Sequence, residues 1–199
     1  MTMSESSAEH HLSFGPSALA TPANALTITR LVITPYLLWM IVTNGHSWPA
    51  LALWITLAVS DGFDGHLARK YGTTRSGAFL DPLADKVLVL GTAWALVAAD
   101  RFWWVPVAII TVRELGIQAL RSYYGRRGLA IEARYWAKVK TVVQEVAIGF
   151  ALLPLTAEEA DWIPNAVLWV AVVLTVVTGV NYVLDGRAAA STMARADSA

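Results

Sequence analysis

The sequence predicts an all-α integral membrane protein, in which six transmembrane helices surround a polar chamber that opens to the cytoplasmic side. Hydrophobic residues make up 56% of the 199 residues and charged residues only 15%. The mean hydropathy of +0.49 is unusual for a soluble domain. The hydrophobic residues gather in long segments, and four aspartates stand close together in the stretch from Ser60 to Lys86.

Six apolar segments are the candidate transmembrane helices. In chain order they run from Leu26 to Val42, Trp48 to Val59, Val87 to Ala99, Phe102 to Val112, Val142 to Leu155 and Ile163 to Leu184. Only the last is a charge-free run of about 20 residues, the length that a bilayer requires. Polar or charged residues complete each of the others at one end, so we expect those ends to meet water or the polar chamber.

The two ends of the chain are expected to lie outside this domain. Residues 1–21 are rich in Ser, Ala and His and lack a basic start typical of a signal peptide, so we expect a disordered tail. One domain is then expected over residues 22–186, followed by a loose tail over residues 187–199. Cysteine is absent, which excludes disulfides and thiolate catalysis. The net charge of zero gives no reason to expect nucleic acid as a partner.

The distribution of Lys and Arg predicts a multi-pass protein of the cell membrane with both termini in the cytoplasm. If the first helix starts in the cytoplasm, Arg101 is the one basic residue between the helices that falls on the outer side of the membrane. The basic residues that fall inside are Arg69, Lys70, Arg75, Arg121, Arg126, Arg127, Arg134, Arg187 and Arg195. The same threading places the four aspartates at similar depth on the cytoplasmic side, together with Arg113 and Lys138.

The four aspartates form two pairs with helical spacing. Asp61 and Asp64 are three residues apart and Asp81 and Asp85 are four apart, so each pair projects from one face of its helix. Facing pairs would gather four carboxylates at membrane depth, which is very costly without cations or protons. Hard divalent ions are the expected partners, although helix capping and ion pairs with nearby basic residues are the simpler alternative.

Residues suited to phosphate stand next to these aspartates. Gly65 and Ala68 leave a face without bulk, and Arg69, Thr74 and Arg75 supply hydrogen-bond donors. Four carboxylates contribute about −4 and a diphosphate about −2, so two dications would restore an approximate balance of charge. The pattern therefore indicates a phosphate-handling site with two metal ions.

The run Asp61-x-x-Asp64-Gly65-x-x-Ala68-Arg69, followed by Gly77-x-x-x-Asp81-x-x-x-Asp85, resembles the signature of the CDP-alcohol phosphotransferase family. The loop from Lys70 to Ser76 is one residue shorter than the family usually has. Asn24-x-x-Thr27-x-x-Arg30 resembles the first helix of the family. Arg113-Glu114 and Lys138-x-Lys140-Thr141-x-x-Gln144 resemble its branch that makes phosphatidylglycerol phosphate. The resemblance covers about residues 22–186.

The resemblance implies transfer of a phosphatidyl group from CDP-diacylglycerol to an alcohol, with release of CMP. It implies that Asp61, Asp64 and Asp81 bind two Mg²⁺ ions, with Mn²⁺ as the alternative, and that Asp85 is a ligand of the second ion and the general base. The implied contacts to CDP-diacylglycerol come from Asn24, Thr27, Gly65, Arg69 and Thr74. The resemblance also implies a homodimer.

Arg113, Lys138 and Lys140 are the candidates for binding an acceptor that carries a phosphate, such as sn-glycerol 3-phosphate. Because Lys138 and Lys140 are two residues apart, only one is expected to face the chamber. An internal ion pair with Glu114 is the alternative for Arg113. For the whole chain, the alternatives are a phosphatidylinositol-phosphate synthase of the same family, a divalent-cation transporter and a structural scaffold.

Overall fold

The computed structural model describes residues 22–71, 77–126 and 135–196 of the chain. Within these ranges, the side chains of residues 22–24, 61–71, 77–81, 135, 137, 157–158 and 189–196 are outside the description. The described part contains helices and no strands, which confirms the all-α prediction. Its helices are α1 (Pro22–Asn44), α2 (Trp48–Tyr71), α3 (Gly77–Ala98), α4 (Trp104–Arg126), α5 (Tyr135–Leu152), α6 (Pro154–Glu159) and α7 (Trp162–Ala196).

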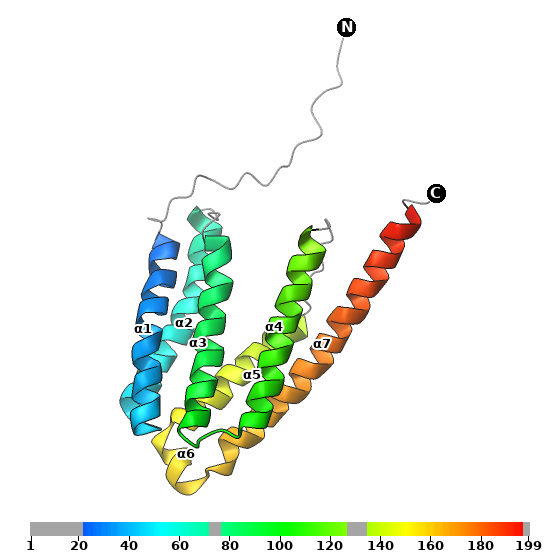
Figure 1. The fold of residues 1–199 in the computed structure, drawn as a ribbon. Coiled ribbons are helices and arrows are strands. Elements are labelled where there is room, and N and C mark those ends of the chain that lie inside the picture. Colours follow the sequence, from blue (N-terminus) through cyan, green and yellow to red (C-terminus); the bar gives the residue numbers. More distant parts are fainter. Residues whose placement is uncertain (1–21, 72–76, 127–134, 197–199) are drawn as a thin grey trace.

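Each of the six long helices contains all or most of one apolar segment. The helix starts of α1 and α3 and the helix ends of α4 and α7 lie at the same end of the bundle, with α6 at the opposite end (Figure 1). Helix α7 leans away from α4 toward its C-terminus and stays helical to Ala196, through most of the stretch expected to be a loose tail. The alanines of that stretch are strong helix formers.

Prolines explain where several helices begin. Pro49, Pro106 and Pro164 lie in the first turns of α2, α4 and α7, where a missing N–H removes no helical hydrogen bond. Pro154 starts α6 and ends α5 at Leu152, so the predicted segment from Val142 to Leu155 is divided in two. The hydroxyl of Thr156 donates to the carbonyl of Phe150, which Pro154 cannot reach with an N–H.

The apolar core fills the half of the bundle near α6. Leu37, Ile41, Leu96, Ile148 and Leu152 are all at most 1% exposed, and they come from the last turns of α1, α3 and α5. Helix α1 packs against α2 and α3, while α7 packs against α4 and α5. A smaller apolar cluster, Ile117, Tyr124 and Tyr182, joins α4 and α7 toward the other end of the bundle, where α1 and α3 start.

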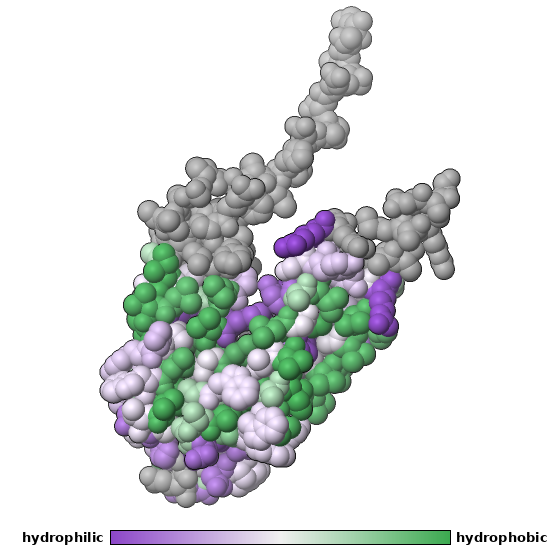
Figure 2. All heavy atoms as spheres, in the orientation of Figure 1, coloured by the Kyte–Doolittle hydropathy of each residue, from purple (hydrophilic) through white to green (hydrophobic). Residues whose placement is uncertain are grey.

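Large hydrophobic side chains cover much of the outer face. Val32 is 71% exposed, Val112 73% and Val173 60%, and hydrophobic residues run along the sides of the helices in Figure 2. Two helical segments, 25–44 and 162–188, are each long and apolar enough to cross a membrane. Exposed apolar surface on this scale is typical of a protein whose sides contact lipid.

Candidate active site

The four aspartates lie on two helices, as the spacing predicts. Asp61 and Asp64 are in the second half of α2, and Asp81 and Asp85 are in the first half of α3. Asp85 is half-buried and interacts with a neighbouring group. The side chains of the other three are outside the described residues, and no metal-ligating group of three or more is found among the side chains that are described. The metal site therefore stays a prediction.

The predicted nucleotide residues are described only in part. Thr27 is fully buried in α1, and Arg30, one turn later, is 1% exposed, so both face the inside of the bundle. Thr74 lies outside the described residues, and so do the side chains of Asn24 and Arg69. Gly65 lies in α2, between the aspartates and the loop. Their contacts with a nucleotide also stay predictions.

A cluster of charged side chains joins α3, α4 and α5. Its carboxylate, Glu114, is paired with three cations among the described side chains: Lys86 at 3.5 Å, Arg113 at 3.0 Å, and Lys140. Arg113 and Lys140 bind the same oxygen, Oε1, while Lys86 approaches Oε2. Lys140 is only 5% exposed. We call Lys86, Arg113, Glu114 and Lys140 the Glu114 cluster.

Helix α7 completes this polar layer through two threonines. Arg113 Nη2 donates to Thr178 Oγ1 at 2.9 Å, and Gln144 Nε2 donates to Thr175 Oγ1 at the same distance. The Thr178 hydroxyl donates in turn to the carbonyl of Leu174 at 2.7 Å, which directs its lone pairs to the guanidinium. Four helices thus hold the charged groups in place.

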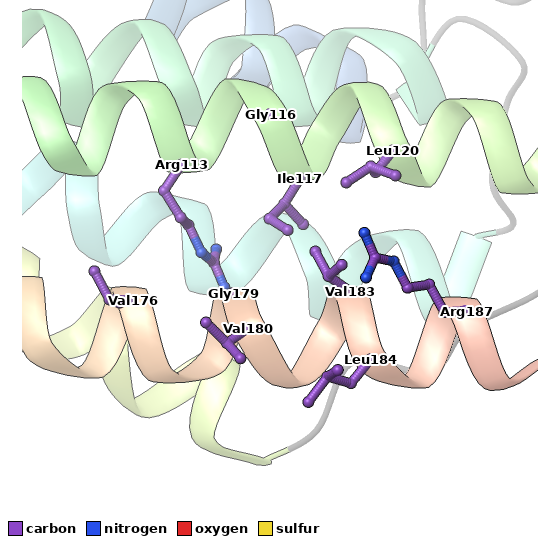
Figure 3. Close-up of a pocket in the computed structure, with 10 residues that line it drawn as sticks. All are labelled: Arg113, Gly116, Ile117, Leu120, Val176, Gly179, Val180, Val183, Leu184 and Arg187. Carbon is purple, nitrogen blue, oxygen red and sulfur yellow. The ribbon is translucent and has the colours of Figure 1, made fainter.

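Arg113 can reach Thr178 because Gly179 has no side chain. A Cβ at Gly179 would stand 3.0 Å from Arg113 Nε and 3.3 Å from its Cγ. Arg113 extends from α4 across to α7 at this glycine (Figure 3). Its Nε is buried and has no hydrogen-bond partner among the described residues. The guanidinium therefore keeps a donor that no described residue uses.

A groove of about 470 Å³ continues from Arg113 along α4 and α7. Six aliphatic side chains and two glycines line it, with Arg113 at one end and Arg187 at the other (Figure 3). Val180 and Leu184 are more than half exposed, so the α7 wall of the groove reaches the outer face of the bundle.

The structure brings together two of the three predicted acceptor residues. Arg113 and Lys140 meet at Glu114, whereas Lys138 is exposed on another face of α5, as expected for residues two apart. The ion pair between Arg113 and Glu114, the alternative for Arg113, is also formed. Within the described residues, this ion pair and the bond to Thr178 use one N–H each of Nη1 and Nη2, so three of the five guanidinium N–H groups have no partner there.

Sequence reasoning missed the part played by Lys86 and by the threonines of α7. No motif in the sequence assigns a role to Lys86, which lies 3.5 Å from Glu114. Thr175 and Thr178 are three residues apart in an apolar helix, which is a recognisable signal of a polar stripe facing the bundle interior.

Comparisons with known proteins agree with the resemblance. The family model of CDP-alcohol phosphatidyltransferase matches residues 20–177. A probable phosphatidylglycerophosphate synthase of Mycobacterium tuberculosis (strain H37Rv) is 44% identical over 176 residues, which cover 85% of this chain and 83% of that protein. The CDP-diacylglycerol–glycerol-3-phosphate 3-phosphatidyltransferase of Escherichia coli K12 is 34% identical over 178 residues, covering 82% of this chain and 93% of that protein. The chain therefore belongs to the CDP-alcohol phosphatidyltransferase family and is an enzyme of that class.

Proposed function

We propose that this enzyme transfers the phosphatidyl group of CDP-diacylglycerol to sn-glycerol 3-phosphate, giving phosphatidylglycerol phosphate and CMP. The names of both relatives support this acceptor. The observation that carries the proposal is the charge of the Glu114 cluster, where three cations face one carboxylate and leave a net charge of about +2. A phosphate monoester carries about −1.5 to −2 near neutral pH, which matches this charge.

The cluster also has free donors for a phosphate. Lys140 uses one of its three N–H groups on Glu114, and Arg113 keeps the N–H at Nε. Charge-assisted hydrogen bonds from both groups would hold phosphate oxygens more strongly than neutral donors would. Lys138, which is exposed, would contribute mainly by attracting the anion toward the site. An acceptor without a phosphate, such as serine, would have less use for these groups.

Asp85 is the proposed general base, as the resemblance to the family implies, and it lies on α3 next to Lys86 of the cluster. It would take the proton from an acceptor hydroxyl as that oxygen forms a bond to the β-phosphorus. The bond between the β-phosphorus and the oxygen bridging to the α-phosphate breaks, and CMP leaves. Asn24, Thr27, Gly65, Arg69 and Thr74 are proposed to hold the nucleotide and diphosphate in line for this attack.

Members of this family use divalent metal, and the donor set of this chain suits it. We propose that Asp61, Asp64, Asp81 and Asp85 hold two ions, Mg²⁺ or Mn²⁺, since carboxylate oxygens are the ligands that these hard cations prefer. When bound, such ions would neutralise the negative charge of the diphosphate and the charge that develops on the departing CMP. The half-buried position of Asp85 on α3 is compatible with both of its roles.

The six long helices are proposed to cross the membrane with both termini and the site on the cytoplasmic side. The exposed apolar faces and the helix lengths support this, because helices of 18 to 35 residues span about 27 Å or more. The basic residues of the connections support the orientation. A homodimer belongs to the same proposal, and the mass of the purified protein in detergent would test it.

The acceptor can be tested by offering sn-glycerol 3-phosphate, inositol phosphate and serine in turn with CDP-diacylglycerol. We expect CMP release and a new lipid only with glycerol 3-phosphate. Transfer only to inositol phosphate would favour the phosphatidylinositol-phosphate synthase, and cation uptake by liposomes without CMP release would favour a transporter. Asp85→Asn should abolish turnover while CDP-diacylglycerol binding is largely kept, and full activity would refute its role as base.

A further inference from the structure

We propose that Glu114 is a positioning residue for the acceptor phosphate: it fixes Arg113 and Lys140 so that their remaining donors converge on one anion. This inference rests on the proposed function, in which those two cations bind the acceptor. Glu114 itself touches no reacting atom in this account. Its role follows from where its two oxygens are used.

One oxygen of Glu114 sets the separation of the two cations. Arg113 Nη1 and Lys140 Nζ both donate to Oε1, although they come from α4 and α5. Two donors on one oxygen lie within about 6 Å of each other, and a single phosphate group can accept from both across such a gap. The other oxygen faces Lys86, which links the cluster to the helix that carries Asp85.

Without the carboxylate, the three cations would repel one another in a largely dry site. Lys140 is 5% exposed, so water cannot replace the lost partner where it stands. Its flexible four-carbon stem would carry the ammonium away from Arg113. Arg113 would keep only its hydrogen bond to Thr178, which fixes one edge of the guanidinium. The distance between the Arg113 guanidinium and the Lys140 ammonium, the two groups proposed to bind the phosphate, would then no longer be fixed.

The change in charge and the change in position are expected to have opposite effects on phosphate binding in Glu114→Gln. The substitution raises the net charge of the cluster from about +2 to about +3, which on charge alone should tighten phosphate binding. Loss of the shared anchor should weaken it. We expect the second effect to prevail, because the amide oxygen that remains is neutral and holds two cations much more weakly than a carboxylate oxygen does.

The test compares wild type and Glu114→Gln in three constants: the KM for glycerol 3-phosphate, the KM for CDP-diacylglycerol, and the Ki for inorganic phosphate as a competitor of the acceptor. We expect the first and third to rise together by about tenfold or more, while the second stays within about twofold. Glu159→Gln is the control, since Glu159 is an exposed carboxylate in α6 at the opposite end of the bundle.

Other outcomes would overturn the proposal. An unchanged or lower Ki for phosphate would show that Glu114 does not position the cations, and a rise in the acceptor KM alone would place Glu114 against the glycerol. Equal rises in all three constants would indicate a structural role. If Glu114→Gln does not fold, Glu114→Asp keeps the charge and retracts the carboxylate, and the same pattern is required of it. If wild type used another acceptor, the proposed function would fail, but the Ki for phosphate against that acceptor would still test Glu114.

Discussion

Replacing Gly179 with alanine tests whether the position of Arg113 matters for acceptor binding. The new Cβ would stand 3.0 Å from Arg113 Nε, whereas ordinary contact begins at 3.4 Å, so the guanidinium must move by a few tenths of an ångström. It is held on two sides, by a 2.9 Å hydrogen bond to Thr178 and a 3.0 Å bond to Glu114. Any shift away from α7 lengthens the first of these bonds.

The size of the effect follows from these contacts. Weakening one hydrogen bond of a charged group costs about 1–2 kcal/mol. This cost corresponds to a rise of about 5- to 30-fold in the KM for glycerol 3-phosphate. The KM for CDP-diacylglycerol should not change, because the three atoms nearest to the new Cβ all belong to Arg113, which is proposed to bind the acceptor.

The assay is steady-state CMP release with each substrate varied in turn. Gly116→Ala is a matched control: Gly116 lines the α4 side of the same groove, and a Cβ there meets nothing within 4 Å. The reasoning would be refuted if Gly179→Ala, folded and active, had the acceptor KM of wild type. It would also be refuted if both substrate constants rose equally.

Two further predictions concern the lysines of α5 and the packing of α7. Lys140→Met should raise the KM for glycerol 3-phosphate far more than Lys138→Met, because Lys140 is buried and paired with Glu114 while Lys138 is exposed; equal effects in the acceptor assay would contradict this. Gly186→Ala should destabilise the fold by about 1–3 kcal/mol, since its Cβ would stand 2.6 Å from the ring of Tyr124. Thermal unfolding should show a lower midpoint than for Gly125→Ala, whose Cβ meets nothing within 4 Å.

The helices could be predicted because hydrophobicity marks each one directly. A chain that must satisfy its backbone hydrogen bonds internally continues as helix past the apolar segment, which is why α2 runs on from Val59 to Tyr71. The sequence shows a proline at position 154, but hydropathy alone does not predict that one helix ends and another begins there. Thr156 supplies the replacement hydrogen bond there, and such a local exchange of partners is not evident from hydropathy.

The polar contacts could be predicted less well, because they depend on which helix faces come together. Arg113 and Lys140 were candidates from their type and motif, yet their common anchor joins α4 and α5 through residues 26 apart in sequence. The bond from Arg113 to Thr178 spans 65 residues. Periodicity gives the face of one helix at a time, and the packing of α4 against α7 decides which faces meet.

The central claim is that the Glu114 cluster recognises the phosphate of the acceptor. The most direct measurement compares kcat/KM for sn-glycerol 3-phosphate with kcat/KM for glycerol, the same alcohol without its phosphate, in wild type and in Lys140→Met. We expect a strong preference for the phosphorylated acceptor in wild type and a much smaller one in the variant, because Lys140 supplies buried charge to the site. Equal use of the two acceptors by wild type, or a preference that survives loss of Lys140, would contradict it.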